Sequence, residues 1–206
     1  FAILSGCALF TPSTGRVELA LGAGGGARTI LPTVTVASYR ISFSGPVVKA
    51  PVVTTDSNPT IDLEVGTWDI SVEGRDSGGD TVAVGGASDV VVTAGDTTPV
   101  SIVLSAQSAG SGTIDVTVTW PASVNPAIDA IEVTLDGAAV NPITLTSGGS
   151  PLTWVRYEEE MASGSYQLCF VLKSGTVLRA SVQEAVQVYM NLTSSATIAL
   201  TEADFT

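Results

Sequence analysis

Apolar and polar residues alternate along most of the chain, and this period-two pattern predicts β-strands. In residues 68–72 every second side chain is apolar, beginning with Trp68, and the side chains between them are polar. The same alternation recurs at 100–104 and 114–118, which would place one face of each strand on a core. Clusters of Gly, Asp and Ser separate such stretches, for example at 76–80. Frequent turn signals between short strands are typical of an all-β sandwich or barrel.

Helical patterns are weak by comparison. The nearest candidates are residues 127–135 and 155–162, although positions 131–135 alternate as a strand does. The acidic run from Glu158 to Glu160, followed by Met161, fits a single helical turn. The sequence therefore predicts a chain without a complete helix.

An internal repeat organises the strand-like segments, because four segments of the first half read like four of the second half in the same order. The matched pairs are 15–21 with 112–118, 39–45 with 131–137, 66–72 with 164–170, and 98–104 with 194–200. Four matches in one order indicate that a single module occurs twice.

The repeat leads to a fold class and to domain boundaries. We predict an all-β chain of two tandem immunoglobulin/transthyretin-like β-sandwich domains with about seven strands each. The first domain would span residues 15–105 and the second residues 112–206, with 106–111 as a small, polar linker. Residues 1–14 would precede them as an apolar N-terminus and tether.

Charge and composition exclude several classes of function. The 206 residues include 8 Lys and Arg against 20 Asp and Glu, for a net charge of −12, and no histidine. Phosphate binding needs clustered cations, so no nucleic acid is expected as a partner. Without histidine, imidazole-dependent catalysis and imidazole-ligated metal sites are excluded. We therefore expect a protein that is not an enzyme and carries no cofactor.

The N-terminus carries a short motif. Leu4-Ser5-Gly6-Cys7 follows apolar residues and resembles the lipobox of bacterial lipoproteins, in which small residues precede a cysteine that accepts a lipid. The resemblance implies lipidation of Cys7 and a lipid membrane as partner. An intact N-terminal β-strand is the other interpretation, in which apolar residues pair with a neighbouring copy of the chain. The side chains available for such strand donation are Ile3, Leu4, Ala8, Leu9 and Phe10.

Longer segments carry a second resemblance. Residues 66–72, 81–85 and 92–104 together resemble tandem immunoglobulin-like modules of bacterial surface lipoproteins, and residues 183–198 look like the closing part of such a module. A more distant likeness is to fimbrillin-type pilus subunits, which are lipoproteins of two β-sandwiches. The resemblance implies an extracellular or outer-surface location, either lipid-anchored or in a surface filament.

Two groups of side chains could bind a ligand. Asp76 and Asp80 bracket a Ser-Gly-Gly turn and form a weak calcium candidate, although Asp and Gly are also ordinary turn residues. Trp120 precedes Pro121 at a predicted strand end, and Trp154 lies near Tyr157; exposed rings at these positions would form a platform for carbohydrate. Packing at a domain edge is the alternative for these three rings.

Three functions remain open from the sequence. The first is a non-enzymatic, exported surface protein with a structural or adhesive role, anchored through Cys7, with a host or matrix ligand. The second is a subunit of an extracellular filament or pilus, assembled by N-terminal strand donation. The third is a carbohydrate-binding accessory module.

Overall fold

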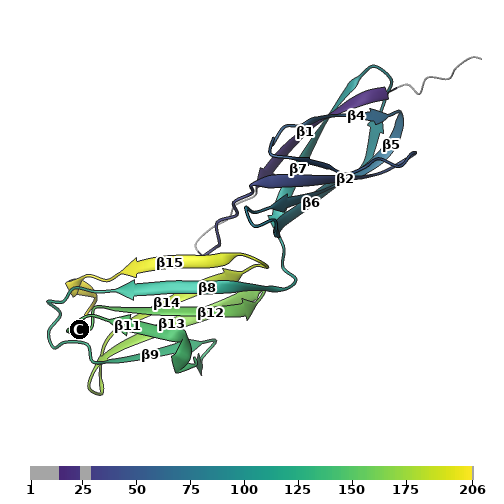
Figure 1. Cartoon of the computed structure of the whole chain (residues 1–206). Coiled ribbons are helices and arrows are strands. Elements are labelled where there is room, and N and C mark those ends of the chain that lie inside the picture. The colour runs from purple at the N-terminus through teal and green to yellow at the C-terminus, as the bar shows by residue number, and fades with distance from the viewer. Residues whose placement is uncertain (1–13, 24–28, 206) are drawn as a thin grey trace, which may run out of the picture. The chain divides into compact units, whose positions relative to one another are not determined.

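The computed structural model describes residues 14–23 and 29–205, which form β-strands and two short 3-10 turns (Figure 1). The predicted all-β class is confirmed. The predicted helical turn at Glu158–Glu160 is wrong, because these residues lie in a strand whose backbone pairs with a neighbouring strand from end to end. Cys7 and the predicted strand-donor residues lie outside the described residues.

The chain divides into two compact units. Of the described residues, 14–23 and 36–105 form module 1, and 29–35 and 106–205 form module 2. The later boundary between the two modules lies between Ser105 and Ala106. Residues 29–35 lie within the first repeat in sequence but belong to module 2 in the structure. We call them the crossing segment.

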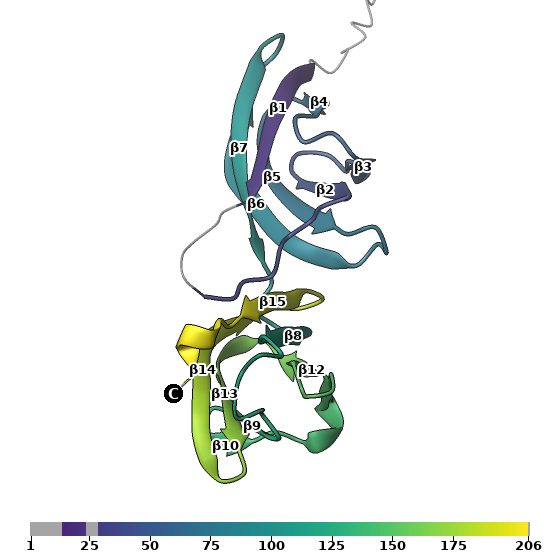
Figure 2. The ribbon, with the colours of Figure 1, turned by 90° about the vertical axis from the view of Figure 1, so that its left-hand side faces the viewer.

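Module 1 is a seven-stranded sheet in the order β3-β2-β5-β6-β7-β1-β4. Its strands are β1 (Thr14–Ala23), β2 (Ser38–Ser44), β3 (Val52–Thr54), β4 (Thr60–Glu64), β5 (Gly66–Arg75), β6 (Thr81–Val92) and β7 (Thr97–Ala106). The strands of module 1 curve strongly, as Figure 2 shows. Trp68 on β5 is buried, and its indole N–H donates to the carbonyl oxygen of Glu64, at the end of β4, at 2.9 Å. The alternation at 68–72 therefore fills a core, as expected for Trp68.

Module 2 has two four-stranded sheets, β10-β9-β13-β14 and β11-β12-β8-β15. Its strands are β8 (Ser111–Thr119), β9 (Ala130–Leu135), β10 (Ala138–Ala139), β11 (Leu145–Gly148), β12 (Trp154–Ala162), β13 (Gly164–Ser174), β14 (Val177–Val188) and β15 (Thr193–Ala199). The 3-10 turns η1 (Pro142–Thr144) and η2 (Glu202–Asp204) complete it.

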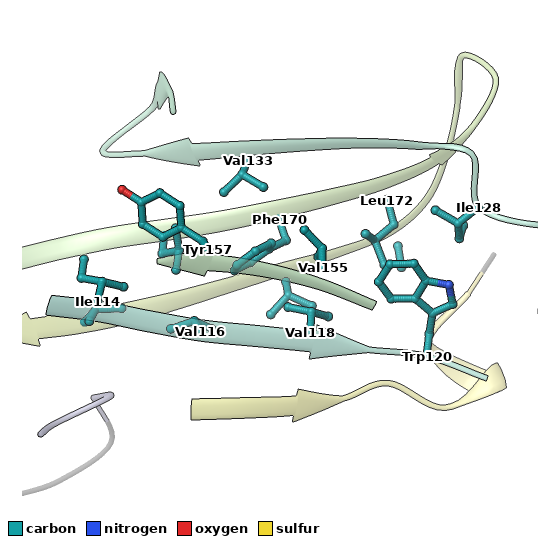
Figure 3. Packing of buried hydrophobic residues seen from close by; sticks show 14 of the residues in the cluster. Ile114, Val116, Val118, Trp120, Ile128, Val133, Val155, Tyr157, Phe170 and Leu172 are labelled. Atoms are coloured by element: carbon teal, nitrogen blue, oxygen red, sulfur yellow. The ribbon is translucent and has the colours of Figure 1, made fainter. Parts of the chain in front are cut away.

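The core of module 2 lies between its two sheets. Ile114, Val116 and Val118 from β8 face Phe170 and Leu172 from β13, and all five side chains are fully buried (Figure 3). Burying one such side chain is worth about 1.5–3 kcal/mol before entropy is counted. β13 pairs along most of its length with both β9 and β14, and its buried side chains lie at the centre of this core.

Strand pairing shows that the two modules are copies of one fold. β1 pairs antiparallel with β4 and parallel with β7, and β8 pairs antiparallel with β12 and parallel with β15. In the other half, β5 lies between β2 and β6 as β13 lies between β9 and β14. The first strand of each module therefore lies between β4 and β7 in module 1 and between β12 and β15 in module 2. In immunoglobulin domains the first strand lies beside the second instead.

One side-chain hydrogen bond recurs at the same place in both modules. The hydroxyl of Thr98 on β7 donates to the carbonyl of Val91 on β6, and the buried hydroxyl of Ser194 on β15 donates to the carbonyl of Gln187 on β14. In the predicted repeat Thr98 corresponds to Ser194. The repeat is therefore visible in local bonding as well as in strand order.

Candidate functional site

The calcium candidate is a hydrogen-bonded turn. One carboxylate oxygen of Asp76 accepts the backbone N–H groups of Gly78 and Asp80, each at 2.9 Å. The backbone N–H of Asp76 donates to the carbonyl of Asp80 at 3.0 Å. Asp76 is thereby engaged in closing the β5–β6 turn, as an Asx turn does. Among the described residues, no group of three or more His, Cys, Asp or Glu side chains could hold a metal ion.

Two of the three rings of the predicted carbohydrate platform lie in the core. Trp120 is only 5% exposed, and its indole N–H donates to the carbonyl of Leu152 at 2.7 Å. Tyr157 is fully buried, and its hydroxyl donates to Glu159 at 2.7 Å; Figure 3 shows both rings pointing into the module 2 core. Stacking on a sugar needs an exposed ring face, so these two residues form no platform.

Trp154, the third ring, lies on the outer face of the β11-β12-β8 sheet, where it is partly exposed. It pairs with Gly148 on β11, and a Cβ at Gly148 would come within 2.8 Å of the indole. The ring therefore covers the backbone of a cross-strand glycine, a packing role that stabilises strand pairs.

Charges on the same face are paired across strands. Arg156 on β12 donates to both carboxylate oxygens of Asp115 on β8, at 2.6 and 2.9 Å, and contacts Glu158 at 2.9 Å. These hydrogen bonds to Arg156 lower the pKa of the Asp115 carboxyl, outweighing the opposing effect of burial. Bidentate pairing of this kind is among the stronger surface interactions, and here it links β12 to β8.

Other carboxylates accept hydrogen bonds from the backbone. Asp129 accepts from Gly175 N–H at 2.7 Å, and Asp136 accepts from Gln167 N–H at 2.8 Å. In module 1, Asp69 accepts from the N–H of Asp89, which has a left-handed φ of 56°, at 3.1 Å. These acidic side chains fix turns and loops between strands.

Shallow depressions occur on the surface. One of about 380 Å³ lies over β2, β5 and β6, next to the Asp69–Asp89 irregularity, and its polar lining includes Ser42, Ser71 and Ser88. No helix in the described part of the chain is long and apolar enough to span a membrane.

The most distinctive feature is the edge of β14, which sequence reasoning did not find. In the crossing segment, Ile30 N–H donates to the carbonyl of Ala185 at 2.9 Å, and Gln187 N–H donates to the carbonyl of Ile30 at 3.0 Å. This is a parallel bridge between Ile30 and Val186, and the Ile30 side chain packs against the module 2 core. The β14 edge thus accepts an extended segment that lies about 150 residues earlier in the chain.

Comparisons with known proteins give distant likenesses. No protein-family model matches the sequence, and no curated protein matches it. A leucine-rich repeat protein from Bacteroides thetaiotaomicron aligns at 12% identity and a TM-score of 0.33, over 92% of this chain and 27% of that one. This chain thus spans about a quarter of that protein.

Two further structures are of more similar length. A proposed cell adhesion protein from Bacteroides eggerthii aligns at 11% identity and a TM-score of 0.39, over 92% of this chain and 86% of that one. The minor pilin of Streptococcus agalactiae aligns at 10% identity and a TM-score of 0.29, over 91% and 95%. Because these TM-scores are below 0.5, a function has to be argued from the residues of this chain itself.

Proposed function

We propose that this protein is a non-enzymatic protein of the bacterial outer surface with a structural or adhesive role. A lipid on Cys7 would tether it, and its two β-sandwich modules would face the outside. The observation that carries the proposal is the use of its acidic side chains. Asp115 pairs with Arg156 on the neighbouring strand, while Asp76, Asp129 and Asp136 accept backbone N–H groups in turns and loops. These carboxylates, the most abundant reactive groups of the chain, therefore stabilise the fold of the two modules.

The anchoring step rests on the lipobox resemblance of Leu4 to Cys7. A lipid on Cys7 would leave Cys169, a free and half-buried thiol on β13, without a disulfide partner in the same chain. A single acyl chain gives only marginal membrane binding, and stable anchoring takes more than one; the diacylglycerol that a lipobox cysteine accepts supplies two.

The test is metabolic labelling with an alkyne fatty acid in a bacterial host that processes lipoproteins, using the full-length precursor. Cys7→Ser should abolish labelling and move the protein from the membrane fraction to the soluble one. Cys169→Ser is the matched control, since it removes the other cysteine, and it should label as the wild type does. Protease added to intact cells should degrade the wild-type protein.

Two results would overturn the proposal. Equal labelling of wild type and Cys7→Ser would exclude the anchor. Unlabelled chains that retain residues 1–6 and form fibres in negative-stain micrographs would instead support the filament subunit. In that case Ile3, Leu4, Ala8, Leu9 and Phe10 would act as donor residues.

A further inference from the structure

The outer edge of β14 exposes more hydrogen-bonding groups than the crossing segment uses. Ala185 and Gln187 direct backbone groups away from β13, toward Ile30. In an antiparallel pair this direction alternates, and the β13–β14 register is unbroken between residues 180 and 188. Ser181 and Gln183 therefore direct their N–H and C=O groups toward the same edge, where no described residue pairs with them.

The side chains along this edge do not block pairing with another strand. Ser181, Gln183 and Ala185 are exposed, small or neutral, and alternate with buried Val182 and Val186. Edge strands that resist pairing carry Lys, Pro or inward-pointing charges. Between residues 181 and 187 the one such charge is Glu184, which is half-buried on the face of Val182 and Val186, and the crossing segment pairs with β14 beside it.

The crossing segment is held on β14 by two backbone hydrogen bonds. A parallel strand that continued past Ile30 would donate its next hydrogen bond from the N–H of residue 32. Residue 32 is proline and has no N–H, so this bond cannot form. The carbonyl of Gln187, where that bond would form, accepts the hydroxyl of Ser194 instead. The segment therefore stays on β14 through one bridge, the partly buried Ile30 side chain and the buried ring of Pro32. Because only two backbone hydrogen bonds have to break, the segment opens at a lower free-energy cost than a fully paired strand.

We propose that the β14 edge is a strand-acceptor site that takes residues 29–32 of a second copy of the chain in place of its own, so that copies become linked through module 2. The incoming segment makes the same two backbone hydrogen bonds and inserts the same Ile30 side chain. Every copy carries both the segment and the edge, so exchange needs no second protein. The purified chain is sufficient to test this, whether or not Cys7 is lipidated.

The test is disulfide trapping on a Cys7→Ser, Cys169→Ser background. The Ile30–Val186 bridge places residues 31 and 187 side by side, at a strand spacing of about 4.8 Å that suits a disulfide. One chain carrying both Leu31→Cys and Gln187→Cys should form an intramolecular disulfide. A mixture of the two single variants should form covalent dimers on mild oxidation, with a yield that rises with protein concentration.

The control mixture combines Leu31→Cys with Val103→Cys, an exposed position on β7. We expect at least tenfold more dimer from the Leu31→Cys and Gln187→Cys mixture, and a peptide of residues 27–34 should suppress it. Dimer no more abundant than in the control, or absence of the intramolecular disulfide, would overturn the proposal. Suppression by a peptide of residues 2–10 and not by that of 27–34 would also overturn it, because the edge would then belong to the N-terminal segment.

Discussion

Module 1 and module 2 share one strand order, apart from the additional edge strand β11 of module 2. They differ at the seam where the sixth strand of the repeat (β6 or β14) meets its last strand (β7 or β15). In module 1 the strand order passes from β6 to β7, and these two strands are joined by the side-chain bond from Thr98 to Val91. In module 2 the corresponding strands, β14 and β15, belong to separate sheets. Both seams keep the hydroxyl-to-carbonyl bond, from Thr98 in one and Ser194 in the other. The open seam is where Ile30 binds.

The difference shows how a duplicated fold can gain an interaction. A β-strand edge is a template for further pairing wherever it is left uncovered. In module 1 the last strand, β7, follows β6 in the strand order and bonds to it through Thr98. In module 2 the edge of β14 pairs with the crossing segment instead. A small change in strand pairing, with the same core arrangement, thus gives β14 an edge that can accept an extended segment.

The largest expected effect tests whether the modules are separate units. Trp68→Ala should destabilise module 1 and Phe170→Ala should destabilise module 2, each by about 3–5 kcal/mol, because each removes a fully buried ring. Hydrogen exchange followed by mass spectrometry would report the two modules separately. Each variant should raise exchange in its own module, and equal effects on both modules would contradict the division.

The positions of the strands and of the core residues were predictable from the sequence because both arise from local alternation. The pair 66–72 and 164–170 became β5 and β13, and the pair 98–104 and 194–200 became β7 and β15. The alternation of Val155 and Tyr157 with charged neighbours could also have indicated that Tyr157 is buried and that Glu158–Glu160 is a strand.

The crossing segment could not be predicted in the same way. Residues 29–32 read Thr-Ile-Leu-Pro, without alternation, and their partner Val186 is distant in sequence. Trp120 was misjudged for a similar reason: its indole N–H donates to the carbonyl of Leu152, in a loop that follows three intervening strands, β9, β10 and β11. Non-local contacts made by single residues leave no periodic signal.

The second prediction concerns the seam itself. Ile30→Ala should destabilise module 2 by about 1–2 kcal/mol, because a partly buried side chain leaves its core. Leu31→Ala, at a neighbouring side chain that is 36% exposed, should change the free energy of unfolding by less than about 0.5 kcal/mol. Thermal unfolding of the two variants measures the difference. Greater destabilisation of module 1 by Ile30→Ala would mean that the crossing segment belongs there.

The third prediction compares one ion pair in each module. Asp115, whose side chain is 25% exposed, pairs with Arg156, whereas Asp62 pairs with Arg16 at 67% exposure. Asp115→Asn should cost about 1 kcal/mol of unfolding free energy, and Asp62→Asn much less, because solvent screens an exposed pair. Denaturant titration at pH 7 compares the two variants, and equal losses would contradict this ranking.

The same pair gives a pH dependence. The pKa of Asp115 is lowered in the folded state, so its stabilisation is present above the unfolded-state value of about 3.9. It is lost as the pH falls through the lower folded value. The difference in stability between wild type and Asp115→Asn should therefore shrink below about pH 4. A difference that is constant from pH 7 to pH 2 would show that the charge of Asp115 is not the cause.

The smallest expected effect lies at high pH. Burial raises the pKa of the Tyr157 phenol above its ordinary value, and the hydrogen bond to Glu159 acts in the same direction. Stability from the neutral phenol is present below about pH 10 and is lost as the pH rises further. Tyr157→Phe should lose less stability than the wild type between pH 9 and 11. Parallel stability curves for the two proteins would exclude this contribution.

Hydrogen exchange at the β14 edge of the full chain tests the central claim most directly. If the crossing segment completes module 2, Ile30→Asp should speed exchange of the Gln187 amide and of residue 30, while the equivalent strand β6 in module 1 keeps its protection. Leu31→Asp, which adds the same charge at the neighbouring exposed position, should leave both strands unchanged. Unchanged exchange at Gln187 in Ile30→Asp, or equal changes in β6 and β14, would contradict the account.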